Sequence, residues 1–412
     1  MNIRRTIGML LPALLISCTG DAEEKYVPPT TPATPTEPDV VVYHERAKAQ
    51  FDLINQYYQV RTGATTGFYN ENYPKQASDN AASFLWPYDG LVSGVATLQA
   101  LGYNVDYTAF VARFDRYYRP SAGSVNIGGY GSQTDGTQGG GTRYYDDNSI
   151  VGIDLVEAYN LTKDNTYLAK AKQVVTFLKS GEDDTFGGGL WWDEDEKNQA
   201  GNGNSNKPAC ANGFATLFLL EYYAVCPQSE KADVLAFAKR LYSWLKTNLR
   251  DPADGCYWND KQADGSINQT KWTYNSGAMI ASGVRLYRYT SEQAYLDDAI
   301  ASATGAYSYF VRPAGSLALA YPNHDPWFTI KLVKAFIDLV PYYKAASGYV
   351  DTFANYLNYA YDHARSSNGL FYEDWTGTNA NPSRSAQLLM QDAALESLGV
   401  IALYKGESAT KE

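Results

Sequence analysis

Two adjacent acids, Asp146 and Asp147, are the residues whose types and spacing best suit catalysis in this sequence. They stand in the segment Tyr-Tyr-Asp-Asp-Asn at positions 144–148, between aromatic and amide side chains. Two neighbouring carboxylates repel each other, and aromatic surroundings lower the local dielectric constant, so the two pKa values are expected to move apart. One group would then be ionised while the other keeps its proton, which is how paired carboxyl groups cleave glycosidic bonds.

Comparison within the chain indicates that the scaffold does not require acids at these two positions. Three segments place an aromatic residue three positions before a polar one: Trp86 before Asp89, Tyr145 before Asn148, and Trp272 before Asn275. Only the second segment has two acids in between, where the others have Pro-Tyr and Thr-Tyr. A single Asp often caps a helix, and that role stays open for either residue. Carboxyl groups on adjacent residues lie close together, which favours the separation of about 5–5.5 Å of retaining glycosidases over the wider one of inverting enzymes.

These segments belong to an internal repeat. The stretches after Asn148 and Asn275 are similar at an offset of about 127 residues, and each indicates a helix, a short turn and a second helix. Inner helices are expected to start near positions 89, 148, 212, 275, 331 and 392, roughly 60 residues apart. Loops of Gly, an apolar residue and aromatics occur at 67–69, 189–192, 255–258 and 369–372. Six αα-hairpins of this kind predict an all-α fold, an (α/α)6 toroid or barrel whose aromatic loops converge on one end.

Composition limits the partners that we expect. Asp and Glu number 45 against 34 Lys and Arg, giving a net charge of −11, and no basic block follows Arg5, so nucleic acid is not expected. The 35 Tyr and 8 Trp exceed what a core needs and suit a surface that stacks on sugars. His44, His324 and His363 are scattered and have no companions at metal-binding spacings, so neither a metal nor a cofactor is expected.

The first 42 residues indicate export and anchoring. An apolar run ends in Leu-Ile-Ser before Cys18, which predicts a lipoprotein signal peptide over 1–17 and a lipid on Cys18; a plain signal peptide with an incidental Cys is the alternative. Five prolines between positions 26 and 39 predict an extended spacer within the linker 18–42. The catalytic domain is expected over 43–406, followed by a tail at 407–412. We expect an outer-membrane lipoprotein exposed at the cell surface, with a periplasm-facing anchor as the alternative.

Four motifs together resemble glycoside hydrolase family 76, the endo-α-1,6-mannanases and related fungal cell-wall transglycosidases. They are 144–148, 187–192 (Gly-Gly-Gly-Leu-Trp-Trp), 211–213 (Ala-Asn-Gly) and 272–277 (Trp-Thr-Tyr-Asn-Ser-Gly), and the similarity extends over about residues 43–404. The resemblance implies an (α/α)6 barrel that hydrolyses α-1,6-linked mannan with retention of configuration and without a metal. It implies that Asp146 is the nucleophile and Asp147 the general acid and base. α-Mannan would be the partner of a monomeric protein that meets the membrane only through Cys18.

Aromatic and polar residues near the pair, or in equivalent repeats, are candidates for binding the sugar: Trp86, Asp89, Tyr145, Asn148, Trp191, Trp192, Asn212, Asp264, Trp272, Tyr274 and Asn275. Core packing of the tryptophans, helix capping by the asparagines and a plain exposed turn at Asp264 are the alternatives. Three other functions stay open: a transglycosidase, another (α/α)6 enzyme acting on a different glycan, and a glycan-binding lipoprotein without catalysis. An enzyme of acidic sugars would need basic residues near its site, whereas these motif loops are acidic and aromatic.

Overall fold

The computed structural model describes residues 41–121, 125–134, 140–378 and 387–409. The chain divides into two units, residues 1–41 and 42–412, and the second contains every helix and strand described. The expected signal peptide over 1–17, the lipidation site at Cys18 and nearly all of the linker over 18–42 lie outside the described residues.

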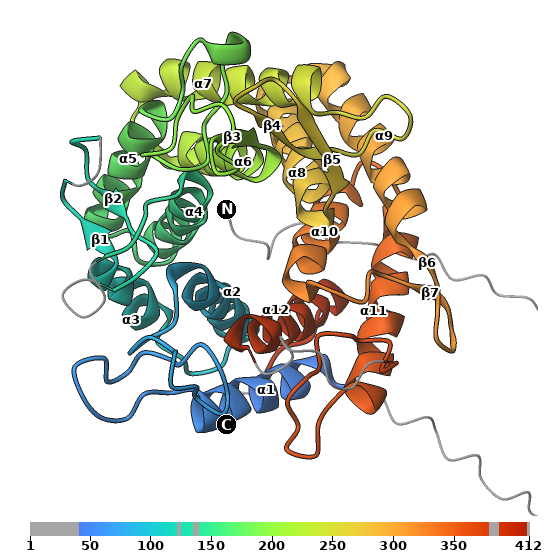
Figure 1. Ribbon diagram of the computed structural model, residues 1–412. Helices are drawn as coiled ribbons and strands as arrows, with labels where there is room; N and C mark the ends of the chain where they lie inside the picture. The colour runs from blue at the N-terminus through green and yellow to red at the C-terminus, as the bar shows by residue number, and fades with distance from the viewer. Residues whose placement is uncertain (1–40, 122–124, 135–139, 379–386, 410–412) are drawn as a thin grey trace, which may run out of the picture. The chain divides into compact units, whose positions relative to one another are not determined.

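The described α-helices of the second unit form an inner and an outer layer, and the chain alternates between them. The inner helices are α2 (Leu85–Leu101), α4 (Tyr145–Thr162), α6 (Ala209–Val225), α8 (Thr273–Thr290), α10 (Pro326–Leu339) and α12 (Leu388–Lys405). The outer helices are α1 (Tyr43–Tyr57), α3 (Tyr107–Ala112), α5 (Asn165–Lys179), α7 (Gln228–Asn248), α9 (Gln293–Phe310) and α11 (Ala346–His363). Successive inner helices pack side by side, and α12 contacts both α10 and α2, so the inner layer closes into a ring (Figure 1). The predicted all-α fold of six αα-hairpins is confirmed.

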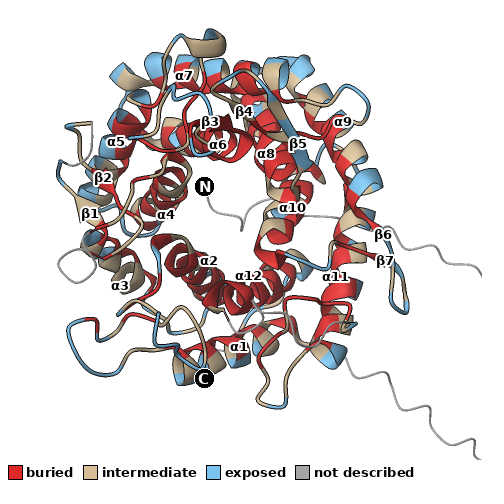
Figure 2. Cartoon of the chain, viewed as in Figure 1, coloured by how far each residue is buried: buried red, intermediate tan, exposed pale blue. Residues whose placement is uncertain are grey.

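The sequence of each layer explains its place. Inner helices are buried on nearly every side, and in α12 every residue from Leu388 to Ala402 is buried, whereas outer helices bury one face (Figure 2). Glycines let inner helices approach closely: a Cβ on Gly94 of α2 would lie 2.7 Å from the side chain of Leu395, and one on Gly277 of α8 would lie 2.8 Å from the backbone of Leu332. The ring therefore depends on these positions having no side chain.

Strands are minor, as expected. Short antiparallel pairs join β1 (Tyr118–Arg119) to β2 (Gly129–Tyr130) and β6 (Arg312–Ala314) to β7 (Leu317–Ala320), and a three-stranded sheet orders β3 (Asn206–Pro208), β4 (Trp258–Gln262) and β5 (Ile267–Lys271). Two 3-10 turns, η1 (Arg113–Arg116) and η2 (Thr185–Gly187), complete the described elements.

The four glycine-aromatic loops each lie between an outer helix and the next inner helix. Gly67, Gly189, Gly255 and Gly369 have φ between +76° and +89°, a conformation that residues with a Cβ adopt only at a cost, which explains the repeated glycine. After each glycine, an aromatic or apolar residue pairs through its backbone with a residue two or three positions past the end of the preceding outer helix, as Leu190 pairs with Glu182. The paired residues of these loops, Tyr69, Leu190, Tyr257 and Phe371, are themselves buried in the core.

Side chains fill the middle of the ring. The first two turns of the inner helices contribute a hydrophobic cluster of Ile150, Cys210, Phe214, Ala278, Trp327, Leu389, Met390 and Ala393, with Trp86, Tyr274 and Phe328 packed against it. Further along the same helices, fully buried Glu396 of α12 accepts from Lys331 (2.7 Å), which is largely buried, and from Lys334 (2.8 Å), which is exposed; both lysines belong to α10.

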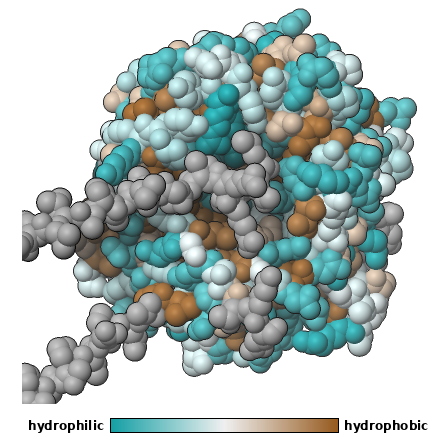
Figure 3. All heavy atoms as spheres, turned by 180° about the vertical axis from the view of Figure 1, so that it is seen from behind, coloured by the Kyte–Doolittle hydropathy of each residue, from teal (hydrophilic) through white to brown (hydrophobic). Residues whose placement is uncertain are grey.

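The surface seen from behind is a mixture of hydrophilic and hydrophobic side chains, and the hydrophobic ones form small separate patches (Figure 3). None of the helices within the described ranges is long and apolar enough to cross a membrane.

Candidate active site

Asp146 and Asp147 occupy the first turn of inner helix α4, and both are half-buried. Because the amino end of a helix carries partial positive charge, this position favours an anion. Asp146 accepts three hydrogen bonds: its Oδ1 from the backbone N–H of Asp147 (3.0 Å), and its Oδ2 from Trp192 Nε1 (3.1 Å) and Cys210 Sγ (3.1 Å). No described residue donates to the carboxyl oxygens of Asp147. The two acids are therefore neighbours in unlike environments.

These environments separate the two acids in the expected direction. Burial raises the pKa of Asp147 well above the usual carboxyl range, and the negative charge of Asp146 raises it further. Burial also raises the pKa of Asp146, but the hydrogen bonds from Cys210, its own backbone and Trp192 stabilise the anion and oppose that effect. Asp146 is thus the easier of the two to ionise, and Asp147 is the one that keeps its proton.

The loop that carries Trp192 is fastened to the start of α4. The carbonyl of Trp192 accepts from the N–H of Tyr145 (3.0 Å), and the backbones of Tyr144 and Asp193 form a bridge. The ring of Tyr144 stacks on that of Trp192 with centroids 4.7 Å apart. One side of the indole is therefore covered, while its N–H is directed at Asp146.

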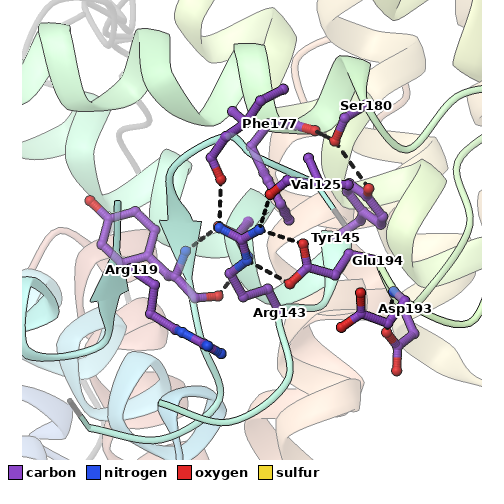
Figure 4. A network of polar contacts seen from close by, with 12 residues as sticks. Arg119, Val125, Arg143, Tyr145, Phe177, Ser180, Asp193 and Glu194 are labelled. Atoms are coloured by element: carbon purple, nitrogen blue, oxygen red, sulfur yellow. Dashed lines mark hydrogen bonds and ion pairs between the residues drawn. The ribbon is translucent and has the colours of Figure 1, made fainter. Parts of the chain in front are cut away.

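Arg143 anchors the segment that leads into this turn (Figure 4). Its guanidinium is fully buried, forms an ion pair with Glu194, and donates to the carbonyls of Ile127 (2.5 Å) and Val125 (2.9 Å). The guanidinium also lies over the ring of Phe177, 5.0 Å from its centroid. A single buried cation thus joins the loop before α4, the loop after the glycine motif and helix α5.

Half-buried aromatic side chains continue from the acids around the ring. Tyr274 of α8 stacks on Phe328 of α10 with centroids 4.0 Å apart, and Trp86 of α2 stacks on the same Phe328 at 5.8 Å. Trp272 meets Phe328 edge-on at 5.6 Å, beside a cavity of about 180 Å³ that His324 and Asp325 also line. Phe328 was not among the predicted site residues, although it is the third residue of its inner helix, as Asp147 is of α4.

Six predicted sugar-binding residues have virtually no exposed surface, which corrects those predictions: Asp89, Tyr145, Asn148, Trp191, Asn212 and Asn275. Trp191 donates its indole N–H to Asp183 (2.7 Å) and packs against the buried ammonium of Lys207, so it supports the loop from inside. Asp89 lies against Asp154, and burial with that neighbouring charge raises the pKa of Asp89 well above the usual range. Asp264 is exposed in the β4–β5 turn and accepts from Ser266, as an Asp-Gly turn predicts.

The asparagines have a shared structural role that also corrects the register of the repeat. The fourth residue of four inner helices accepts a hydrogen bond from a loop backbone N–H: Asn148 from Tyr130 (2.7 Å), Asn212 from Leu190 (2.7 Å), Ser276 from Tyr257 (3.4 Å) and Gln391 from Phe371 (2.9 Å). Ser276, not Asn275, is therefore the counterpart of Asn148. The predicted helix starts at 89, 148, 212, 275, 331 and 392 lie two to five residues inside the helices.

The structure therefore brings together Asp146, Asp147 and Trp192 with Trp86, Trp272 and Tyr274, and adds Tyr144, Cys210 and Phe328. Within the described ranges, no three His, Cys, Asp or Glu side chains are grouped as they would be to hold a metal ion.

The chain is similar to known proteins in both its sequence and its fold. The sequence profile of a family described as Glycosyl hydrolase family 76 matches residues 42–371. No curated protein sequence matches the chain. Among solved structures, the GH76 α-mannanase BT2949 of Bacteroides thetaiotaomicron has a TM-score of 0.75 at 24% identity, covering 88% of this chain and 96% of that one. The GH76A α-1,6-mannanase from Salegentibacter sp. HEL1_6 has a TM-score of 0.67 at 22% identity, covering 88% and 99%.

An inactive variant of the Salegentibacter enzyme has two consecutive aspartates replaced by asparagine and was solved in complex with α-1,6-mannotriose. It has a TM-score of 0.68 at 22% identity, covering 88% of this chain and 99% of that one. At these identities the solved structures show that the fold is shared.

Proposed function

The chain belongs to glycosyl hydrolase family 76, and on this premise we propose that it cleaves α-1,6-mannosidic bonds within mannan, with retention of configuration through a covalent mannosyl-enzyme. The observation that carries the proposal is the unlike environment of two adjacent acids. Asp146 receives three hydrogen bonds that favour its anion, whereas burial and the neighbouring charge keep the proton on Asp147. A retaining glycosidase needs one carboxylate and one carboxylic acid of this kind.

The roles follow from the protonation states. In the first step an oxygen of the Asp146 carboxylate attacks the anomeric carbon, the glycosidic C–O bond breaks, and Asp147 gives its proton to the leaving oxygen. In the second step Asp147, now a carboxylate, takes a proton from water, and the oxygen of that water attacks the anomeric carbon and releases Asp146. Each acid returns to its starting state, so no other reactant is needed.

The half-buried aromatics supply the binding surface in this proposal. Trp86, Tyr274 and Phe328 form a continuous stacked group that reaches the acids through Tyr274 and Cys210, and Trp272 extends it. Aromatic faces pack against the C–H faces of sugar rings while leaving hydroxyl groups free to hydrogen bond. The choice of mannan is supported by the α-1,6-mannooligosaccharides bound to the Salegentibacter variants, whose two consecutive aspartates had been replaced.

The test is incubation of the whole chain, purified in detergent, with unbranched α-1,6-mannan. We expect a ladder of oligosaccharides, which indicates internal cleavage, and products that first appear as the α-anomer by NMR. Asp146→Asn and Asp147→Asn should each lower kcat by at least about 10³-fold. Asp154→Asn is the matched control, because it removes an acid from the same helix away from the pair, and it should stay active. Release of β-anomer, of mannose alone, or full activity in either active-site variant contradicts the corresponding part of the proposal.

We also propose that a lipid on Cys18 holds the enzyme at the outer surface of the outer membrane. The apolar run before Cys18 and the proline-rich spacer after it support this proposal. Metabolic labelling with a fatty-acid analogue should mark the parent and not Cys18→Ser. Protease added to intact cells should digest the parent, and protection from that protease would instead place it in the periplasm.

A further inference from the structure

Cys210 occupies a position where the other inner helices, apart from α4, carry aromatic or apolar side chains. It is the second residue of α6, and the equivalent residues are Trp86, Tyr274, Trp327 and Leu389, whereas α4 has Asp146. The hydrophobic cluster at this level therefore does not require a hydrogen-bond donor from α6. The Cys210 side chain is nevertheless 3.1 Å from Oδ2 of Asp146, and only 8% of the residue is exposed.

We propose that the Cys210 thiol is a positioning residue for the nucleophile: its S–H donates to Asp146 Oδ2, holds the carboxylate in one rotamer beside Trp192, and stabilises its anion. This inference rests on the proposed role of Asp146. Two side-chain donors from different elements, α6 and the loop before β3, meet at one oxygen. That oxygen cannot rotate away without losing both, so the carboxylate stays oriented.

A thiol suits this task because it is a weak donor. Burial raises the pKa of Cys210 well above its usual value, so the group stays protonated and can only donate to a carboxylate. A strong donor would stabilise the anion so well that it attacked the sugar slowly, while no donor would make Asp146 a poor leaving group in the second step. The thiol provides an intermediate strength.

The other titratable groups around Asp146 should not obscure its ionisation in a pH profile of kcat/KM. Asp147 lies on the same helix, Tyr144 precedes it, Cys210 comes from α6 and Tyr274 from α8. Burial raises the pKa values of Tyr144 and Tyr274, so both stay neutral at moderate pH. The negative charge of Asp193 raises the pKa of Tyr144 further, and that of Asp325 raises the pKa of Tyr274. Asp89 of α2 faces Asp154. The acidic limb of kcat/KM therefore reports mainly Asp146.

The experiment compares Cys210→Ala and Cys210→Ser with the parent, using the whole chain and unbranched α-1,6-mannan. In Cys210→Ala we expect the acidic limb of kcat/KM to move up by about 0.5–1 pH unit and kcat to fall about 3–10-fold at unchanged KM, since one hydrogen bond to the anion is lost. Cys210→Ser supplies a stronger donor, so its acidic limb should lie at or below the pH of the parent's limb and not above it. Cys226→Ala is the matched control: Cys226 is also buried and ends the same helix, where its Sγ contacts the carbonyl of Tyr223 at 3.7 Å.

A readout without substrate separates this inference from the proposed function. In protein labelled with 13C at the Asp carboxyl carbons, the resonance that disappears in Asp146→Asn should titrate at a higher pH in Cys210→Ala than in the parent. If that titration and the acidic limb are unchanged, and kcat falls only in step with the melting temperature as in Cys226→Ala, the thiol merely fills space and the inference is wrong. If Asp146→Asn still hydrolyses mannan, the role of Asp146 fails, whatever the titration shows.

Discussion

Replacing Asn212 by Ala should weaken the attachment of the loop that carries Trp192, and so disturb the active site. The Asn212 side chain accepts from the N–H of Leu190 (2.7 Å) and donates to the carbonyls of Leu190 (3.0 Å) and Pro208 (2.8 Å), all in a buried setting. The Ala variant leaves the buried N–H and C=O of Leu190 without these partners. At about 1–3 kcal/mol for each orphaned group, we expect the free energy of unfolding to fall by about 3 kcal/mol.

Asn275→Ala is the matched comparison, because Asn275 is also a fully buried Asn in the first turn of an inner helix. Its side-chain nitrogen and oxygen have no partner among the described residues. Removing it loses no hydrogen bond within that part of the chain, so the change in unfolding free energy should stay within about 1 kcal/mol.

Urea unfolding followed by tryptophan fluorescence and circular dichroism measures both variants. Because Trp192 follows Leu190 in the same loop and donates to Asp146, Asn212→Ala should also lower kcat well below its unfolding temperature, and Asn275→Ala should not. Equal losses of stability in the two variants would refute the reasoning, since the hydrogen bonds to the loop would then not be the cause.

Three further predictions concern the ring itself. Glu396→Gln leaves Lys331, which is largely buried, facing an uncharged partner and should lower the free energy of unfolding by about 3 kcal/mol at pH 7, measured with urea. Burial opposes the charged form of Glu396, but two lysines of α10 prevail and hold its pKa at about 2. The difference from the parent should therefore be full above pH 5 and vanish as the pH falls through 2. Gly277→Ala places a Cβ 2.8 Å from the backbone of Leu332 and should lower unfolding free energy by about 1–3 kcal/mol, and an unchanged urea midpoint would show that the helices can move apart. Burial raises the pKa of Asp154 to about 6, above its value in the unfolded chain, so the stability that it contributes is present at low pH and lost as the pH rises through 6. The stability of Asp154→Asn relative to the parent should therefore increase from pH 4 to pH 7. Urea unfolding midpoints at both pH values measure this change.

The repeat predicted the ring because its cause is local: an apolar inner helix, a Gly with positive φ and an amphipathic outer helix recur along the chain. The acid pair was found for the complementary reason, since the other segments compared lack acids where α4 has two. Contacts between repeats could not be predicted from the sequence. That Cys210 of α6 and Trp192 meet one oxygen of Asp146 depends on how neighbouring helices are placed, and composition could not tell that Trp191 points inward while Trp192 is half-exposed.

The buried asparagines that were predicted to bind sugar show one source of error. Polar residues at a helix start were read as ligands of a sugar, yet Asn148 and Asn212 satisfy the backbone of a loop packed behind them. A register counted from aromatic residues is off by one at Asn275, because the aromatic residue precedes α8, begins α4 and is second in α2. The loop contacts reveal the alignment of α4, α6, α8 and α12. Phe328 of α10 and Asp147 of α4 are equivalent by their distance from the helix start.

Closure of the inner layer by α12 has a consequence for biosynthesis. Helix α12 packs against α1 and α2, which leave the ribosome or a secretion channel long before it. Until residues 388–405 arrive, the apolar flanks of those early helices have no neighbour, and contacts of such long sequence separation form late. A nascent chain of this protein therefore needs protection from aggregation until α12 has been made, and a premature stop codon before residue 388 should abolish the native fold of this domain rather than shorten it.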